Sequence, residues 1–158
     1  MVTSTIVQKI QPVLKSTPRV FLVYLFGSRV QGNIGPRSDI DFGVLIEDPE
    51  EREPERSRLA HEFRKAMGTE RVDVVLLDRA PIELVYAVIA GGECIFQRDE
   101  ETRVEFEAKI LSMYGDYLPV LRAQRKDILQ GENHDRRVQR YREVLRRTER
   151  TLSQFKLS

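Results

Sequence analysis

The sequence predicts an α+β fold, in which a mixed sheet of about four strands has helices packed on one side and is followed by a helical C-terminal extension. Residues 1–98 alternate between helical and strand-type apolar patterns in the order α, β, β, α, β, α, β. From Glu100 onward the strand patterns vanish and a helical stripe replaces them. We therefore expect a core over residues 1–98 and a helical extension over residues 99–158.

The first three elements follow from apolar spacing and from the residues that end each run. Residues 4–15 carry apolar side chains at helical spacing before Pro18, which predicts a helix. Residues 20–26, VFLVYLF, are rich in β-branched and aromatic side chains and end at Gly27, which predicts a buried strand. Residues 39–46, DIDFGVLI, place an apolar side chain at every second position, as expected of a second strand.

A charged segment and a helix come next. Residues 48–58 are almost wholly charged and contain two prolines, so we expect a solvated loop there. The loop leads into a helix that carries Leu59, Phe63 and Met67 and ends near Gly68.

The last elements of the core are shorter. Residues 71–78 predict a third strand, a helix is expected from about Pro81 to Gly92, and residues 93–97 predict a short fourth strand. In the extension, Pro119 interrupts the helical stripe, so the helix must kink or restart there.

The composition excludes several classes of protein. Cys94 is the only cysteine, which rules out an intrachain disulfide and argues against structural zinc. No apolar run approaches the roughly 18 residues that span a bilayer, and the first residues lack the apolar stretch of a signal peptide. We expect a cytoplasmic protein with no membrane partner.

The motif that carries chemistry is the segment GSRVQGNIGPRSDID, from Gly27 to Asp41. Side chains two apart in a strand point to the same face, so Asp39 and Asp41 project together and repel each other unless a cation lies between them. Mg²⁺ prefers oxygen ligands and is commonly shared between one or two carboxylates and substrate phosphates. The pair therefore predicts a magnesium site that takes a triphosphate as its third ligand.

The residues around the turn suit the phosphates of such a ligand. Gly27 lets the backbone turn sharply and approach a ligand, and Ser28 can cap the helix that follows and offer a hydroxyl. Amides at the start of that helix favour phosphate oxygens. Arg29 adds charge or is simply solvated, and Ser38 precedes the aspartate pair. We take these four as candidate nucleotide-binding residues and expect Gly27→Val to weaken binding of the triphosphate more than it lowers stability.

Asp73 lies in the third predicted strand, although an acidic residue on an exposed strand face is common without any function. If that strand lies beside the second, Asp39, Asp41 and Asp73 can hold two ions about 4 Å apart. The ion near Asp41 and Asp73 would activate an attacking hydroxyl, and the ion on Asp39 and Asp41 would neutralise the leaving pyrophosphate. The predicted reaction is in-line attack on the α-phosphorus.

These residues resemble a known family. GSRVQGNIGPRSDIDFGVLI followed by RVDVVLL is similar to the minimal nucleotidyltransferases of the DNA polymerase β superfamily, and the match covers about residues 20–98. Within that superfamily, FEAKILSMYGDYLPVLRAQRKDIL in the extension resembles the MntA-type antitoxins that pair with HEPN-domain toxin ribonucleases. The resemblance implies transfer of AMP from ATP, with Mg²⁺, to a tyrosine of a cognate HEPN toxin, which silences the toxin.

Position by position, the resemblance matches Gly27 and Ser28 to the nucleotide-binding turn. It matches Asp39, Asp41 and Asp73 to the metal carboxylates. All five residues are present, so the resemblance implies an active enzyme.

Three other interpretations compete with this one. Arg56 and His61 nearly match the arginine–histidine pair of HEPN ribonucleases, but Phe63 stands where those toxins have tyrosine and the segment lies between strands. The same site could adenylylate a small-molecule hydroxyl, such as that of an aminoglycoside. A binding antitoxin without catalysis is disfavoured by the intact carboxylates. The oligomeric state, whether homo-oligomer or hetero-oligomer, stays open.

The end of the chain is basic. Residues 133–158 carry eight Lys or Arg against three Asp or Glu, while residues 1–132 sum to −4. This tail has an apolar stripe of helical spacing, at Val138, Tyr141, Leu145, Thr148, Leu152 and Phe155. The tail could pack on its own domain, dock onto a partner, or bind RNA, which is the least favoured of the three. Docking predicts that deleting residues 133–158 weakens toxin binding and leaves Mg-ATP binding intact.

Overall fold

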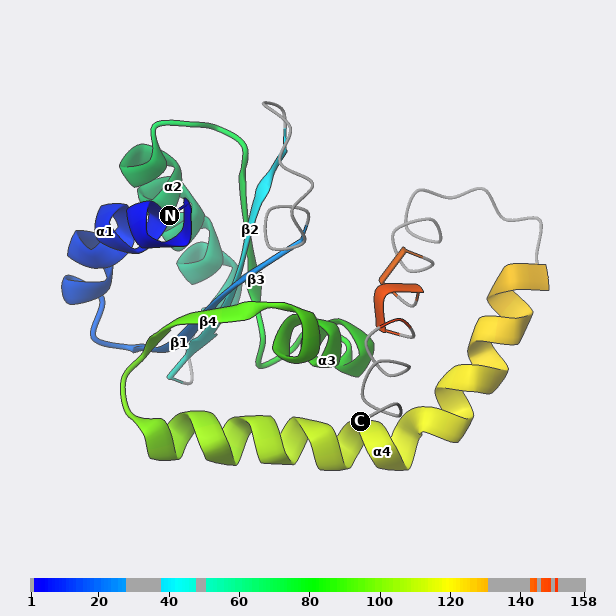
Figure 1. The fold of residues 1–158 in the computed structure, drawn as a ribbon. Helices are drawn as coiled ribbons and strands as arrows, with labels where there is room; N and C mark the ends of the chain where they lie inside the picture. The colour runs from blue at the N-terminus through cyan, green and yellow to red at the C-terminus, as the bar shows by residue number, and fades with distance from the viewer. Residues whose placement is uncertain are drawn as a thin grey trace.

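The computed structural model describes residues 2–27, 38–47 and 51–130, together with residues 143, 144, 146–148 and 150. The order of elements in the core is the one that the sequence predicts (Figure 1). The elements are α1 (Val2–Lys15), β1 (Val20–Phe26), β2 (Ile40–Ile46), α2 (Arg52–Met67), β3 (Val72–Leu76), α3 (Ile82–Gly91), β4 (Glu93–Gln97) and α4 (Glu100–Gln130).

The strands form one mixed sheet in the order β3-β2-β1-β4. β1 pairs antiparallel with β2 on one side and with β4 on the other, and β2 pairs in parallel with β3. β1 and β2 are therefore central, and five of the seven residues in each are buried. The predicted mixed four-stranded sheet is confirmed.

Helices cover both faces of this sheet, so the expectation of helices on one side only is wrong. One face packs against α1 and α2, with the ring centroids of Phe42 and Phe63 4.8 Å apart. The other face carries Leu22 and Tyr24 and packs against Val88 of α3, behind which lies α4 (Figure 1). The reason lies in β1, whose successive side chains are all apolar or aromatic, because a strand that is apolar on both faces needs a layer on each.

α4 is a single long helix that continues through Pro119 and bends in its second half (Figure 1). The expected kink is confirmed, and the helix does not need to restart. The helix packs on α3, where the rings of Tyr86 and Tyr114 stack with their centroids 3.8 Å apart. Near its start, the hydroxyl of Tyr24 in β1 donates a 2.7 Å hydrogen bond to Glu107. These contacts fasten α4 to the core.

α2 begins inside the charged stretch for which the sequence predicts a loop. Pro54 lies in its first turn, where the missing N–H costs no hydrogen bond. Arg56 forms an ion pair with Glu53, and Arg58 forms one with Glu55, each pair about one turn apart. The acidic first turn also suits the helix dipole, so local electrostatics extend the helix toward its N-terminus.

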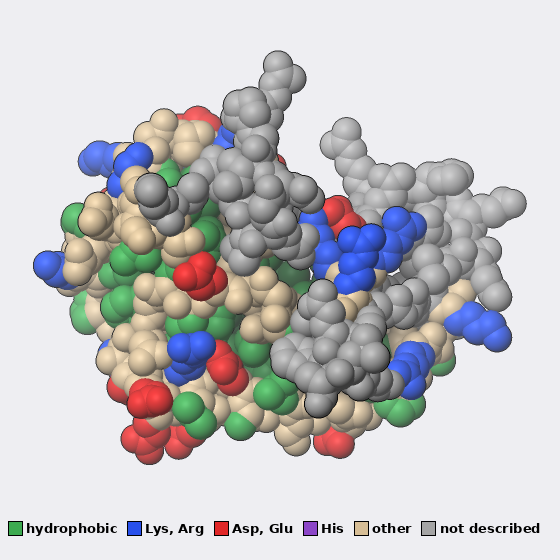
Figure 2. Space-filling model, viewed as in Figure 1, with side chains coloured by type: hydrophobic (Ala, Val, Ile, Leu, Met, Phe, Trp, Pro, Cys, Tyr) green, Lys and Arg blue, Asp and Glu red, His purple; other side chains and the backbone are tan. Residues whose placement is uncertain are grey.

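The described residues between 143 and 150, which we name the C-terminal segment, are helical, as the sequence predicts. Thr148 is only 2% exposed, and its hydroxyl donates a 2.9 Å hydrogen bond to the carbonyl of Val144. This burial supports packing of the C-terminal segment on its own domain. The other positions of the apolar stripe lie outside the described residues. Figure 2 shows basic side chains gathered at this segment and acidic ones at the start of α4.

Candidate active site

Two of the predicted carboxylates and the predicted turn lie on three neighbouring strands, at one end of the sheet. Phe26 at the end of β1 pairs with Asp41 in β2, and Asp41 is in register with Asp73 in β3. Residues in register on neighbouring strands point to the same face, so the two carboxylates lie side by side. The expectation that the third strand lies beside the second is confirmed.

Asp41 and Asp73 face the side of the sheet that α3 covers. Their neighbours along the strands are buried in the core on the opposite side: Ile40, Phe42, Val72 and Val74. Both aspartates are half-buried. The carboxylates thus lie at the rim of the sheet, supported by the core and still accessible to a ligand.

Gly27 contacts the carboxylate of Asp41 directly. Its φ of +87° is in the left-handed region, which disfavours residues with a side chain. A Cβ atom at this position would lie 2.3 Å from Oδ2 of Asp41, which is too close for any real contact. A glycine is therefore required both by the turn and by the space that the Asp41 carboxylate occupies.

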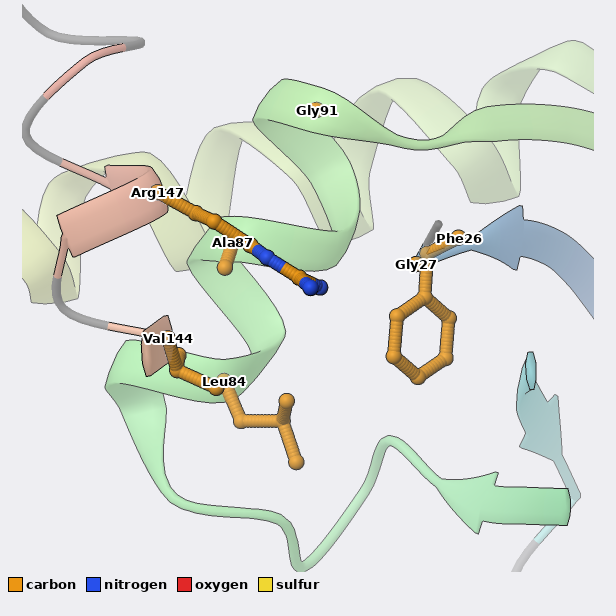
Figure 3. A pocket seen from close by; sticks show the side chains of 7 residues that line it. All are labelled: Phe26, Gly27, Leu84, Ala87, Gly91, Val144 and Arg147. Atoms are coloured by element: carbon orange, nitrogen blue, oxygen red, sulfur yellow. The ribbon is translucent and has the colours of Figure 1, made fainter. Parts of the chain in front are cut away.

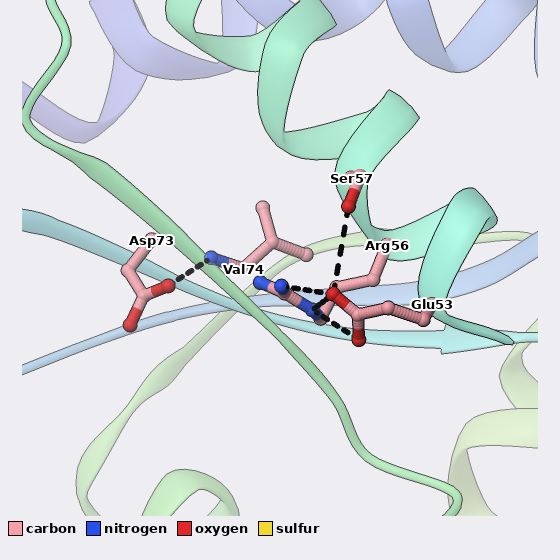
Figure 4. A network of polar contacts seen from close by, with 5 residues as sticks. All are labelled: Glu53, Arg56, Ser57, Asp73 and Val74. Atoms are coloured by element: carbon pink, nitrogen blue, oxygen red, sulfur yellow. Dashed lines mark hydrogen bonds and ion pairs between the residues drawn. The ribbon is translucent and has the colours of Figure 1, made fainter.

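Asp73 is held by its own strand and lies near a positive charge (Figure 4). Its Oδ1 accepts a 3.0 Å hydrogen bond from the N–H of Val74. The pKa of Arg56 on α2 is raised, first by its hydrogen bond to Glu53 and in smaller part by the Asp73 carboxylate. The same hydrogen bond lowers the pKa of Glu53. The sequence offered no signal for this neighbour of the site, because the start of α2 is predicted as a loop.

The remaining predicted site residues precede β2 or follow β1. Asp39 is exposed and Ser38 is half-buried, both just before the first residue of β2. The N–H of Ile40 donates a 2.9 Å hydrogen bond to the carbonyl of Arg71, which anchors this approach to β3. Ser28 and Arg29 lie outside the described residues.

Asp41 and Asp73 together are suited to bind a metal ion. In the part of the chain that the structure describes, no group of three or more His, Cys, Asp or Glu side chains is arranged to hold a metal ion. Mg²⁺ commonly binds through one or two carboxylates and fills its other positions with water and phosphate oxygens. The adjacent oxygens of Asp41 and Asp73 fit that mode of binding.

A pocket adjoins Gly27 on the side of α3 (Figure 3). Its walls come from the end of β1, from α3 and from the C-terminal segment. The lining residues are Phe26, Gly27, Leu84, Ala87, Gly91, Val144 and Arg147. Because Phe26 is the register partner of Asp41, the pocket continues the row formed by the two aspartates.

The fold and this arrangement match a known family. The family described as "Polymerase beta, Nucleotidyltransferase" matches residues 8–101. The match spans more than half of the chain and includes Gly27, Asp41 and Asp73. The chain belongs to this nucleotidyltransferase family.

Relatives of this nucleotidyltransferase include MntA proteins. Protein adenylyltransferase MntA of Shewanella oneidensis is 36% identical over 99 residues, which are 61% of this chain and 68% of that protein. The crystal structure of a toxin–antitoxin with AMP-PNP is 29% identical, with a TM-score of 0.66 over 78% of this chain and 98% of that one. The structure of a tri-AMPylated HEPN toxin of Shewanella oneidensis in complex with MNT antitoxin is 27% identical, with a TM-score of 0.65 over 80% of this chain and 98% of that one. The predicted resemblance to MntA-type nucleotidyltransferases is confirmed.

The nucleotidyltransferase fold also excludes one of the alternatives. Arg56 and His61 lie on α2, which packs against a mixed sheet, so the interpretation as an all-helical HEPN ribonuclease is wrong.

Among the described residues, no helix is long and apolar enough to cross a membrane.

Proposed function

We propose that this nucleotidyltransferase transfers AMP from ATP to a tyrosine hydroxyl of a cognate HEPN-domain ribonuclease toxin and so neutralises it. The observation that supports this most directly is the in-register pair of Asp41 and Asp73 beside Gly27, in a chain similar to an adenylyltransferase. Among the similar solved complexes, one holds AMP-PNP and another a tri-AMPylated HEPN toxin. Because the reaction consumes ATP, we propose that the protein acts in the cytoplasm.

The carboxylates and the turn have separate roles in this proposal. Asp39, Asp41 and Asp73 are the proposed catalytic carboxylates and would hold the two Mg²⁺ ions. When bound, Mg²⁺ makes the acceptor hydroxyl more acidic and neutralises charge on the pyrophosphate. The peptide backbone at Gly27 approaches the phosphates, with Ser28, Arg29 and Ser38 as further nucleotide-binding residues.

The reaction is a substitution at the α-phosphorus of ATP. The tyrosine oxygen forms a bond to that phosphorus while the bond to the bridging oxygen of the pyrophosphate breaks, and the hydroxyl proton passes to solvent. Because Asp41 and Asp73 point to the same face, the acceptor must approach from the face that α3 borders. We also propose the division into a catalytic core, residues 1–98, and a helical extension, residues 99–158.

The experiment is to incubate the purified chain with Mg-ATP and a purified cognate HEPN-domain protein, and to measure the intact mass of that protein. We expect its mass to rise by one or more AMP groups, and only when both ATP and Mg²⁺ are present. An aminoglycoside offered as acceptor in parallel tests the small-molecule alternative. An unmodified HEPN protein would contradict the proposal, and an adenylylated aminoglycoside would favour the alternative.

A further inference from the structure

The pocket beside Gly27 combines an apolar wall with one cation. Phe26, Leu84, Ala87 and Val144 give it an apolar lining. Among the described residues that line it, Arg147 carries the only charge, and Figure 3 shows its side chain directed across the pocket toward Phe26 and Gly27. A guanidinium in partly apolar surroundings is well suited to bind phosphate, because its planar fork matches two phosphate oxygens.

The packing of the C-terminal segment determines where Arg147 lies. Thr148 next to it is 2% exposed, and Val144 one turn earlier lines the pocket with the side chains of α3. Glu143 pairs with Arg147 from the preceding turn. The Arg147 side chain is 32% exposed, whereas that of Glu143 is 62% exposed, so the cation reaches inward while the carboxylate remains at the surface. A pair with one exposed member is weak and can yield to a phosphate.

The strand register places the acidic residues on one side of Gly27 and the Arg147 guanidinium on the other. Asp73, Asp41 and Phe26 are consecutive register partners, and Gly27 follows Phe26. A triphosphate held at Gly27 therefore has the two carboxylates on one side and the Arg147 pocket on the other. Carboxylates need a cation between themselves and a phosphate, whereas a guanidinium binds the phosphate directly.

We propose that Arg147 is a nucleotide-positioning residue, which the C-terminal segment brings over the turn at Gly27 to bind the phosphates of ATP. The inference rests on the proposed function, because it assumes that ATP binds at this turn. It assigns to the basic tail a role in completing the nucleotide site.

Calorimetry with Mg-ATP tests the inference on the full chain. Arg147→Ala should weaken Mg-ATP binding by about tenfold or more, the usual effect of losing a charge-assisted hydrogen bond. Arg147→Lys keeps the charge without the fork and should recover part of that loss. In transfer assays, Arg147→Ala should raise the KM for ATP more than it lowers kcat. The matched control is Arg146→Ala, which removes the same charge from an exposed neighbour that does not line the pocket and should change affinity less than about twofold.

The outcomes separate this inference from the proposed function. If wild type binds Mg-ATP and Arg147→Ala binds it as tightly as Arg146→Ala does, the inference is wrong and the proposed function stands. Tighter binding by Arg147→Ala would also overturn it, because the side chain would then be occupying space that the nucleotide needs. A wild-type chain that binds no Mg-ATP would overturn both. Circular dichroism checks that each variant is folded. If Arg147→Ala does not fold, the affinity of Arg147→Lys for Mg-ATP provides the test instead.

Discussion

Gly27 and Asp41 constrain each other across two strands. The turn after β1 needs a left-handed backbone at Gly27, and the space where its Cβ would lie is occupied by the Asp41 carboxylate. That carboxylate is the mobile end of a side chain, so a Cβ would displace it rather than disrupt the core. A substitution at Gly27 therefore acts on the carboxylate that lies closest to the turn.

Gly27→Ala should reduce AMP transfer by about 100-fold, because displacement of a catalytic group by about 1 Å has effects of this size. Its cost in stability should be about 1–2 kcal/mol, from the left-handed backbone alone. Gly68→Ala is the matched control, since Gly68 also has a positive φ, of 69°, but a Cβ atom added there would have nothing within 4 Å. Transfer rates and urea denaturation of both variants measure the two effects. Equal transfer by both variants would show that the contact with Asp41 has no role.

Asp41→Asn should lower AMP transfer by at least roughly 100-fold while the protein stays folded, because the change removes the negative charge that a cation requires and leaves the shape of the side chain. Asp41 is half-buried at the rim, so its neutralisation does not open the core. Glu47→Gln, an exposed carboxylate just after the other end of β2, is the control and should transfer AMP normally. Full activity of folded Asp41→Asn would refute the carboxylate mechanism.

At the scale of elements, the strands were the most predictable part. β1 and β4 match their predicted bounds, because β1 is a short apolar run that ends at Gly27 and β4 lies between Gly92 and Arg98. Asp41 and Asp73 were predictable as partners from alternation within their strands, but their register depends on pairing that no single strand encodes. The start of α2 was not predictable from apolar spacing, since ion pairs such as that of Arg56 with Glu53 stabilise it. In the sequence, Arg147 is one of several arginines in the basic tail, and only the tertiary packing distinguishes it from the others.

The hydrogen bond from Tyr24 to Glu107 is a polar link between β1 and α4. Glu107 also accepts a 3.0 Å hydrogen bond from Arg103, so it remains paired when Tyr24 is changed. Tyr24→Phe should therefore lower the free energy of unfolding by only about 1 kcal/mol at neutral pH. Tyr117→Phe, at an exposed tyrosine of α4, is the control and should leave that free energy unchanged.

The same residue predicts a dependence on alkaline pH. Burial, and then the hydrogen bond to Glu107, raise the pKa of Tyr24 well above its usual value of about 10. Above that value the unfolded chain loses the phenol proton while the folded chain keeps it, so stability is complete below about pH 10 and falls as the pH rises further. Urea denaturation between neutral pH and about pH 11 should show a shallower fall for Tyr24→Phe. An unchanged slope would mean that the phenol ionises equally in both states.

Two parts of the chain that are far apart in sequence meet at the candidate site: the strands of the core and the C-terminal segment. The strands supply Gly27, Asp41 and Asp73, and the chain after α4 returns to the same end of the sheet through Val144 and Arg147. The extension and the core therefore meet at this pocket. Its long helix α4 is fastened to the sheet near its start, and its C-terminal segment closes the pocket on α3.

Deletion of residues 133–158 distinguishes this arrangement from partner docking. If the C-terminal segment completes the nucleotide site, the truncated protein should lose affinity for Mg-ATP by about the same factor as Arg147→Ala, roughly tenfold. Removing the cover from Leu84 and Ala87 on α3 should also lower the free energy of unfolding, by about 1–3 kcal/mol. Calorimetry with Mg-ATP and urea denaturation measure these effects, and a pull-down with the HEPN partner measures docking. Intact Mg-ATP affinity combined with weaker partner binding would instead support docking, because the tail would then contribute to the complex and not to the pocket.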